Sequence, residues 1–210
     1  MGKRREKIIL VDLDGTLISC NSFPKWVAFL LLSSFRQLRW WVTVKVAFWL
    51  LWRKLGFSSH QCFKRDLMGL TYPDFYDLAF AKTLLPYLND AVVAAVQAED
   101  AAVRVLSTAA PVNYAAHLVD LLGVDFQRMH STQVHEGQLC ENVGAHKVHY
   151  LRRDFPGDLD ITLYTDHRDD IPLMKVSANV ILVNPSKKCA AAIESCGIKY
   201  SKILSGIEST

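Results

Sequence analysis

The stretch VDLDGTL, residues 11 to 17, places two aspartates two positions apart where an apolar run ends. Residues two apart on a strand project to the same face, so Asp12 and Asp14 both point into one site while Leu13 points into the core. Two carboxylates this close repel each other, and burying like charges is costly. A bound divalent cation, or one carboxyl kept protonated as an acid, relieves that cost. The alternative is an exposed Asp-x-Asp-Gly turn.

Further positions suit a phosphate group. Gly15 allows a tight backbone turn, and its N–H can face an anion. Thr108 follows another apolar run, where its hydroxyl and neighbouring N–H groups such as that of Ala109 can bind phosphate oxygens. Lys147 starts a helical pattern and can act as a point charge for phosphate, although a single lysine is more commonly a solvated surface residue.

A third acidic motif, YTDHRDD, residues 164 to 170, ends another apolar run. Asp166 and Asp170 are four residues apart across a loop, which suits a hard cation and the groups that support its ligands. The alternative is a helix N-terminus enriched in acidic residues. That alternative fits Asp169 better than Asp166, which stands at the very end of the predicted strand.

Short apolar runs alternate with helical patterns along most of the chain. This order predicts an α/β fold, a Rossmann-like parallel sheet flanked by helices, with ligands at the carboxyl ends of the strands. The predicted strands are Ile8–Val11, Val103–Ser107, Ile161–Tyr164 and Asn179–Val183, with a small hairpin over Thr132–Leu139. The predicted helices between them are Pro111–Leu122, Ala145–Arg153, Ile171–Ser177 and Ala190–Cys196.

The segment between the first two strands does not fit a single crossover helix. It reads as an all-helical insertion, because helical patterns follow one another without a strand between them. The predicted helices are Pro24–Ser33, Gln37–Leu55, His60–Leu67, Pro73–Leu84 and Asp90–Ala98. We therefore predict a catalytic core of residues 1–20 plus 99–210 and an inserted helical cap of residues 21–98.

Taken in chain order, these motifs resemble those of the haloacid dehalogenase-like phosphatase superfamily. Its first motif is matched by residues 12–16, DLDGT, and its second by Thr108. The third is matched by Lys147, and the fourth by Asp166 with Asp170. The resemblance covers the core nearly from end to end, and the insertion only by its position and helical character.

The segments LSTAAP, GAHK and TDHRDDIPLM, together with a helical insert directly after the first motif, are similar to the phosphoserine-phosphatase-like subgroup. Two positions depart from the pattern. His167 stands where Ser or Gly is common, and Ala110 stands where a small polar residue often follows the phosphate-binding Thr. Neither departure removes a catalytic group.

The resemblance implies a phosphomonoester hydrolase that works through an aspartyl-phosphate. Asp12 attacks phosphorus, which splits one hard displacement into two. Asp14 protonates the leaving alcohol and then deprotonates the water. The alternative from another class is a non-catalytic regulatory protein that keeps phosphate on its aspartate. Asp14 argues against it, because a long-lived signal has no use for the group that clears the phosphate.

The resemblance also implies a Mg²⁺ cofactor and a phosphate-binding set. The metal ligands are Asp12, Asp166 and the backbone carbonyl of Asp14. Thr108 and Lys147 bind the phosphoryl group, with the N–H groups of Gly15 and Ala109 beside them. Behind the ligands stand Asp169 and Asp170, of which Asp170 orients Lys147 or a metal-bound water.

The charge of the chain is unevenly distributed. Residues Gly15 to Arg65 include eight basic residues and neither Asp nor Glu. The other 16 of the 24 basic residues stand against all 21 acidic ones, so the rest of the chain has a net charge of −5, although the whole carries +3. The basic part also holds all five tryptophans: Trp26, Trp40, Trp41, Trp49 and Trp52.

Residues 40–52, WWVTVKVAFWLLW, are apolar on nearly every face of a helix and too short to span a bilayer, which takes about 20 apolar residues. Such a helix is buried in protein or embedded in lipid. One interpretation is a packed cap with a tryptophan core. The other is an interfacial hairpin, residues 24–55, on an anionic membrane surface. No nucleic-acid partner is expected, because aliphatic residues dominate.

Two substrate classes stay open. In an interfacial protein the substrate is a phospholipid such as phosphatidylglycerophosphate, and the apolar, basic insertion is similar in pattern to the phosphatidylglycerophosphatase C type. The alternative is a phosphorylated small molecule such as phosphoserine. Five scattered cysteines indicate reduced thiols, and only four apolar residues follow the basic start, too few for a secretory signal. We therefore expect a cytoplasmic protein, peripheral on the inner face of a membrane if the insertion binds lipid.

Overall fold

The computed structural model describes residues 5–70, 75–99 and 103–203. Its centre is a seven-stranded sheet in the order β4-β3-β2-β1-β5-β6-β7, in which only the β3–β4 pair is antiparallel. The strands are β1 Glu6–Val11, β2 Val103–Pro111, β3 Arg128–His135, β4 Gln138–Cys140, β5 Leu159–Thr165, β6 Asn179–Val183 and β7 Ser201–Ile203. The predicted parallel sheet of an α/β fold is therefore confirmed.

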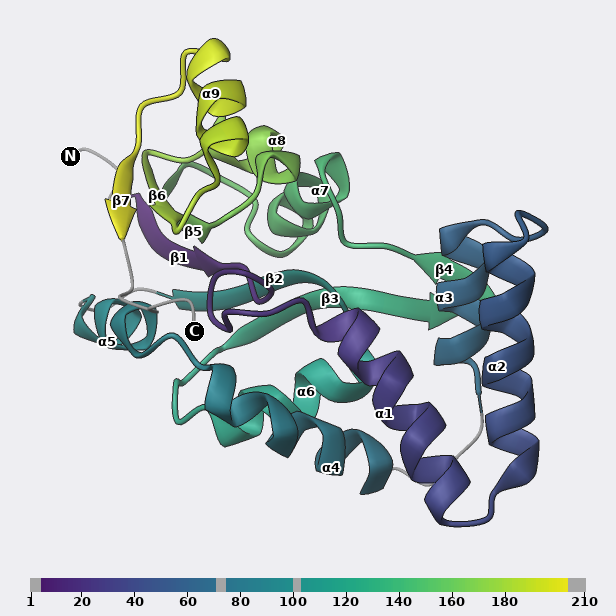
Figure 1. Cartoon of the computed structure of the whole chain (residues 1–210). Coiled ribbons are helices and arrows are strands. Elements are labelled where there is room, and N and C mark those ends of the chain that lie inside the picture. The colour runs from purple at the N-terminus through teal and green to yellow at the C-terminus, as the bar shows by residue number, and fades with distance from the viewer. Residues whose placement is uncertain (1–4, 71–74, 100–102, 204–210) are drawn as a thin grey trace.

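Both faces of the sheet are covered, as the apolar strands require. Successive residues of β1 point to opposite faces: Ile8 and Leu10 pack in one hydrophobic cluster, and Ile9 and Val11 in the other. Helices α7, α8 and α9 cover the first face, and α1, α4, α5 and α6 the second (Figure 1). The covering helices of the core are α6 Val112–Leu121, α7 Ala145–Asp154, α8 Ile171–Met174 and α9 Lys187–Ser195, with a 3₁₀ turn η2 at Arg168–Asp170.

The described residues between β1 and β2 form five α-helices, as predicted. They are α1 Ser22–Arg36, α2 Trp40–Lys54, α3 His60–Met68, α4 Phe75–Leu84 and α5 Asp90–Ala98, with a 3₁₀ turn η1 at Leu85–Tyr87. The predicted start of the fourth at Pro73 lies outside the described residues. One hydrophobic cluster runs from Val11 on the sheet through Trp26 and Phe80 to Phe63. The inserted helices thus share a core with the sheet, and the boundaries at residues 20 and 99 stay a prediction.

Two local features differ from the sequence prediction. Strand β2 continues through Pro111, so α6 begins at Val112, and its register against β3 shifts between Ser107 and Pro111. Strand β7 was not predicted because three partly polar residues at a sheet edge carry no apolar period. The predicted hairpin is confirmed as β3–β4, with positive φ angles at Glu136 and Gly137 (50° and 74°) in its two-residue turn.

Helix α2 packs against α1 and α3 but buries only Val42 and Val46. Of the tryptophans, Trp26 is fully buried, whereas Trp40 and Trp41 are each about half exposed (51% and 48%). The interpretation that the tryptophans form a packed core therefore holds for Trp26 and not for these two. No helix in the described part of the chain has the length and apolarity to cross a membrane.

The contrast between buried and exposed tryptophans predicts different stabilities. Trp26 donates from Nε1 to Asp77 (3.1 Å) within the core, so we expect Trp26→Ala to lower the free energy of unfolding by about 3–5 kcal/mol. The same change at half-exposed Trp40 should cost less than about 1 kcal/mol. Urea unfolding followed by circular dichroism measures both. Equal losses would contradict the placement of these two side chains.

Candidate active site

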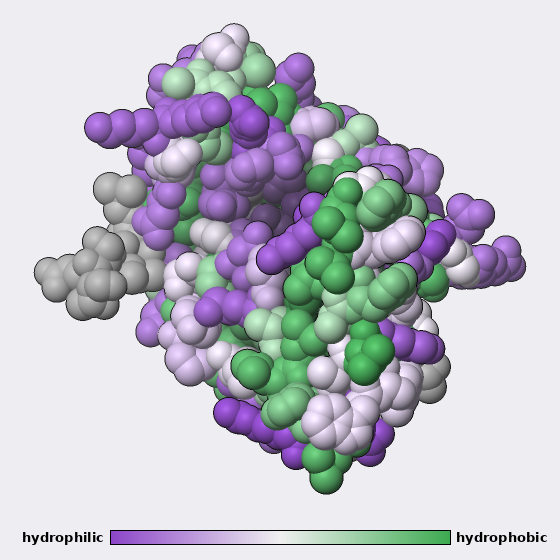
Figure 2. All heavy atoms as spheres, turned by 45° about the vertical axis from the view of Figure 1, so that its right-hand side comes forward, coloured by the Kyte–Doolittle hydropathy of each residue, from purple (hydrophilic) through white to green (hydrophobic). Residues whose placement is uncertain are grey.

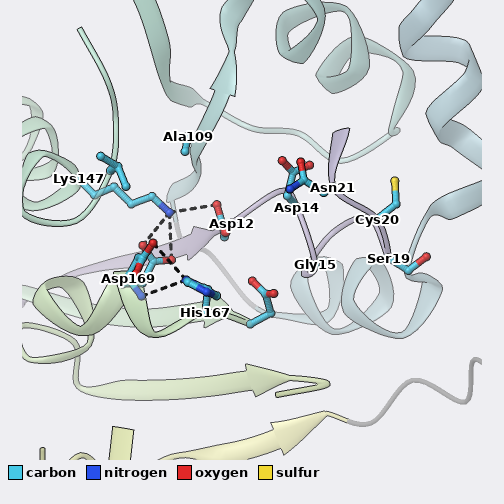
Figure 3. A pocket seen from close by; sticks show the side chains of 13 residues that line it. Asp12, Asp14, Gly15, Ser19, Cys20, Asn21, Ala109, Lys147, His167 and Asp169 are labelled. Carbon is cyan, nitrogen blue, oxygen red and sulfur yellow. Dashed lines mark hydrogen bonds and ion pairs between the residues drawn. The ribbon is translucent and has the colours of Figure 1, made fainter. Parts of the chain in front are cut away.

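The predicted site residues gather at the carboxyl ends of β1, β2 and β5, around a cavity of about 410 Å³. Parallel sheets bind their ligands at this edge, because each strand is followed there by a loop that can carry binding residues. The lining residues are Asp12, Asp14, Gly15, Ser19, Cys20, Asn21, Ala109, Val143, Lys147, Asp166, His167, Asp169 and Asp170. Figure 3 shows that they come from segments far apart in the sequence, with Lys147 directed toward Asp12 in one part of the site and Asp14 beside Asn21 in another.

Lys147, on the first turn of α7, is the centre of the site. Its Nζ lies 3.0 Å from Asp12 Oδ1 and 2.8 Å from Asp170 Oδ1. The Thr165 hydroxyl, at the end of β5, donates to the other oxygen of Asp170 (2.7 Å). Lys147 and Asp170 are almost entirely buried, so the pair is held by the packing of α7 against the strand ends.

Burial sets the charges of this cluster. It raises the pKa of Asp12 to about 7, with repulsion from Asp170 and Asp166 adding to the effect and Lys147 opposing it. Burial alone would lower the pKa of Lys147, but the attraction of Asp12 and Asp170 outweighs it and the pKa is raised. Burial likewise raises the pKa of Asp166 to about 6. The site therefore contains one ammonium group, that of Lys147, among several buried carboxyl groups. This single positive charge does not offset the negative charge that all of them would carry.

Asp14 lies on another side of the cavity. Its Oδ1 accepts a hydrogen bond from Ser22 N (3.0 Å), at the start of α1, and Figure 3 shows it beside Asn21 and directed away from Lys147. Burial raises the pKa of Asp14, and the Ser22 hydrogen bonds only partly offset this. A carboxyl with a raised pKa takes up a proton more readily, which is the property of a general acid.

The carboxylates fit a magnesium ion. Gly15 has φ 74°, and a Cβ atom on it would overlap the Asp166 carboxylate, so the loop after β1 runs directly against Asp166. No group of three or more His, Cys, Asp or Glu side chains in the described residues forms a metal cage. Mg²⁺ needs none, because it keeps several waters and binds through one or two carboxylates. The cost of burying Asp12 near Asp166 is the kind that such a cation removes.

The end of β2 carries the residues predicted to bind phosphate. Thr108 is buried, and its Oγ1 accepts a hydrogen bond from Ala110 N (3.0 Å), which leaves the hydroxyl proton to be donated elsewhere. Ala109 lines the cavity, whereas the buried Thr108, the residue before it, is not among the lining residues. The sequence analysis missed Asn142, whose Nδ2 donates to the Thr108 carbonyl (3.2 Å) and to that of His130 (2.8 Å). A lone asparagine before Gly144 carries no signal for such a role.

The two acidic residues predicted to stand behind the metal ligands differ in placement. Asp170 is buried and holds Lys147. Asp169 lies at the cavity rim with a side chain 60% exposed, its Oδ2 3.3 Å from His167 Nδ1. The structure thus brings Asp12, Asp166, Lys147 and Asp170 together and leaves Asp169 at the edge.

With this geometry in place, the chain can be compared with known proteins. Residues 9–175, which include every motif described above, match the family model of haloacid dehalogenase-like hydrolase. The chain belongs to this family. The predicted superfamily and the prediction of an enzyme are confirmed for this haloacid dehalogenase-like hydrolase, while its subtype is not decided by the match.

Solved structures share the fold of this hydrolase at low sequence identity. A protein of unknown function from Bordetella pertussis Tohama I has 19% identity and a TM-score of 0.73, over 94% of this chain and 99% of that one. A phospho-aspartyl intermediate analogue of phosphoserine phosphatase has 12% identity and a TM-score of 0.59, over 95% and 94%. A family hydrolase from Salmonella enterica serovar Typhi has 13% identity and a TM-score of 0.58, over 95% and 68%. No curated protein matches the chain.

The neighbouring carboxylates at positions 169 and 170 provide a matched pair of variants. We expect Asp170→Asn to lower kcat/KM for p-nitrophenyl phosphate about 10- to 100-fold, because Lys147 loses the anion that orients it. Asp169→Asn, the same change on an exposed side chain, should stay within about twofold of the wild type. Circular dichroism melting checks that both variants fold. Equal losses in both would contradict the bridging role of Lys147.

Proposed function

We propose that the chain is a Mg²⁺-dependent phosphatase that hydrolyses phosphate monoesters through an aspartyl-phosphate on Asp12. The observation that supports it is that two carboxyl groups of one loop have different hydrogen-bond and charge partners. Asp12 is paired with the Lys147 ammonium, while Asp14 is held apart by Ser22 N with a raised pKa. One group is thus set up to attack and the other to carry a proton.

The proposed reaction has two displacements at phosphorus. In the first, an Asp12 oxygen bonds to phosphorus as the bond to the ester oxygen breaks, and Asp14 gives its proton to the departing alcohol. In the second, Asp14 takes a proton from water, the water oxygen bonds to phosphorus, and the bond to Asp12 breaks to release inorganic phosphate. Lys147 and the hydroxyl of Thr108 bind the phosphoryl oxygens throughout.

In this proposal, residues at the ends of the strands provide the ligands for a magnesium ion. The Asp12 and Asp166 carboxylates would hold it, with the backbone carbonyl of Asp14 as the predicted third ligand. When bound, the ion supplies positive charge that offsets the repulsion between the phosphate and the Asp12 nucleophile. A non-catalytic phospho-accepting regulator is the less favoured alternative, because Asp14 is built into the site as an acid and base.

Loss of the nucleophile or of the metal should abolish turnover. We expect Asp12→Asn to lower kcat for p-nitrophenyl phosphate about 10³-fold or more, since no other group can form the covalent intermediate. Chelation by EDTA should stop the wild type, and Mg²⁺ should restore it. Asp120→Asn, an exposed aspartate on α6, is the control. Hydrolysis that survives Asp12→Asn in a folded protein would refute the mechanism.

We further propose that the substrate is a lipid phosphate reached at an anionic membrane surface. The observation that favours it is an unusual run of exposed apolar side chains, here called the interfacial patch, on the end of α1, on α2 and on the loop after it. Its members are Leu32, Phe35, Leu38, Trp40, Trp41, Val44, Phe48, Leu51, Trp52, Leu55 and Phe57, which are 42–70% exposed. Clustered exposure on this scale marks an interaction surface rather than ordinary surface composition.

The charges around the interfacial patch select an anionic lipid surface as its partner. Arg36, Lys45 and Lys54 are exposed among the apolar side chains, and the sequence from Gly15 to Arg65 holds no acidic residue to repel lipid phosphates. Tryptophans and basic residues are the side chains that favour the headgroup level. Figure 2 shows the apolar band across this face, bordered by hydrophilic residues.

The active-site edge faces the same side of the molecule. The arrowheads of β1 and β3 point toward the side on which α1, α2 and α3 lie (Figure 1), and the surface beside the apolar band is hollowed and hydrophilic (Figure 2). This shared orientation supports the proposal that the strand ends receive a headgroup phosphate from the membrane surface. The proposal includes a cytoplasmic location on the inner face of a membrane, with phosphatidylglycerophosphate as an example of the substrate class. A soluble ester such as phosphoserine is the alternative.

Vesicle binding tests the interfacial patch. We expect co-sedimentation with phosphatidylglycerol vesicles and little with phosphatidylcholine vesicles. Trp40→Ser with Trp41→Ser, or Lys45→Gln with Lys54→Gln, should weaken binding about tenfold or more. The control is Lys187→Gln with Lys188→Gln, two exposed lysines on α9, which covers the other face of the sheet. A wild type that ignores vesicles and sediments as a dimer, with monomeric tryptophan variants, would assign the patch to self-association instead.

A substrate panel separates the two substrate classes. We expect a higher kcat/KM for phosphatidylglycerophosphate presented in anionic vesicles than for soluble phosphoserine. The tryptophan variants should lose activity toward the vesicle substrate and keep it toward p-nitrophenyl phosphate, because the patch lies outside the catalytic cluster. A preference for phosphoserine that is unaffected by these variants would contradict the lipid proposal.

A further inference from the structure

A buried lysine from the inserted helices touches the end of β2, which carries the residues predicted to bind phosphate. Lys64, on α3, is 4% exposed, and its Nζ donates to the Ala109 carbonyl (2.8 Å). It also contacts Glu141 Oε1 (3.0 Å) and, more weakly, Thr132 Oγ1 (3.4 Å). A lysine is rarely buried so completely, and here each polar contact is to an element that carries or supports the active site.

The backbone that Lys64 reaches is the one that leaves the sheet. The β2–β3 ladder shifts register between Ser107 and Pro111, so Thr108 and Ala109 lie in a bulge. Buried carbonyl groups in such a bulge need other donors. The Thr132 hydroxyl (2.7 Å) and Lys64 supply them for the Ala109 carbonyl. The bond from Lys64 is charge-assisted and is therefore the stronger kind.

Glu141 is the charged partner of Lys64 in this buried place. The two form an ion pair whose side chains are 5% and 15% exposed, and Gln61, one turn earlier on α3, donates to the other Glu141 oxygen (3.0 Å). Burial would raise the pKa of Glu141, but the hydrogen bond and charge of Lys64 outweigh it and the pKa is lowered. Glu141 also precedes Asn142, which holds the Thr108 carbonyl. The ion pair thus links α3 to the Ala109 carbonyl through Lys64, and to the Thr108 carbonyl through the residue that follows Glu141.

We propose that Lys64 is a positioning residue, which fixes the Ala109 carbonyl and thereby the bulge that presents Thr108 to the phosphoryl group, so that docking of α3 is coupled to phosphate binding. The inference rests on the proposed phosphatase function, because an effect of Lys64 on turnover presupposes that the chain hydrolyses phosphate esters. Its test does not depend on turnover, because inorganic phosphate, the product of the proposed reaction, can be titrated into the same site.

The test must separate positioning from plain stability. Lys64→Met leaves Glu141 buried and unpaired, so it is expected to destabilise the fold as well as the bulge. The double variant, Lys64→Met with Glu141→Gln, removes both charges and should recover most of the melting temperature. The Ala109 carbonyl still lacks its ammonium donor in that variant. Lys64→Arg keeps the charge and a donor.

Calorimetric titration of the Mg²⁺-loaded protein with inorganic phosphate provides the readout. For the double variant we expect about tenfold weaker phosphate binding and a similar rise in KM for p-nitrophenyl phosphate, with a smaller change in kcat. Lys64→Arg should restore part of the phosphate affinity. Wild-type phosphate affinity in a stable double variant would overturn the proposal, as would a loss confined to kcat. If the wild type bound phosphate but hydrolysed no ester, the proposed function would fail while the test of Lys64 would stand.

Discussion

The pairing of one buried ammonium with two buried carboxylates is the constraint on which the rest of the site depends. Lys147 comes from a helix, Asp12 from the end of β1 and Asp170 from the turn after β5. Each of these charges would strongly destabilise the fold if it were buried without a partner, because nothing would then offset the free-energy cost of removing it from water. The cluster therefore forms only when the two central strands and α7 are in place together. Folding of the sheet and assembly of the site are one event.

Two carboxylates of the site were predictable from local sequence. Asp12 directly follows an apolar run and Asp166 comes one residue after Thr165 at the end of another, and a carboxylate there has few structural explanations. Asn142 and Lys64 leave no such mark, since each matters only through carbonyl groups brought to it by the bulge in β2. A sequence shows where a strand ends, but not which distant donor satisfies the backbone that leaves the ladder. The same limit explains why Asp169 and Asp170, adjacent and identical, were both placed behind the metal ligands although only Asp170 is buried.

Helix α2 shows a different limit. Its sequence is apolar on almost every face, which indicates that the helix is covered but not by what. The fold supplies cover only along the line of Val42 and Val46, against α1 and α3. The remaining faces keep their apolar side chains outside, beside the exposed Arg36, Lys45 and Lys54. Asp66 lines pockets at the border of the patch, with Trp41 and with Trp52. The pattern is coherent if the missing cover is a lipid surface.

The inserted helices therefore work in two directions. Outward, α2 and the end of α1 present the interfacial patch. Inward, the N-terminus of α1 holds Asp14 through Ser22, and α3 reaches the phosphate bulge through Lys64. Helix α2 packs on both α1 and α3, so it is joined through packed side chains to the two helices that contact the active site. If the substrate is taken from a lipid surface, as proposed, the helices that would meet that surface are thus connected to those that support the site.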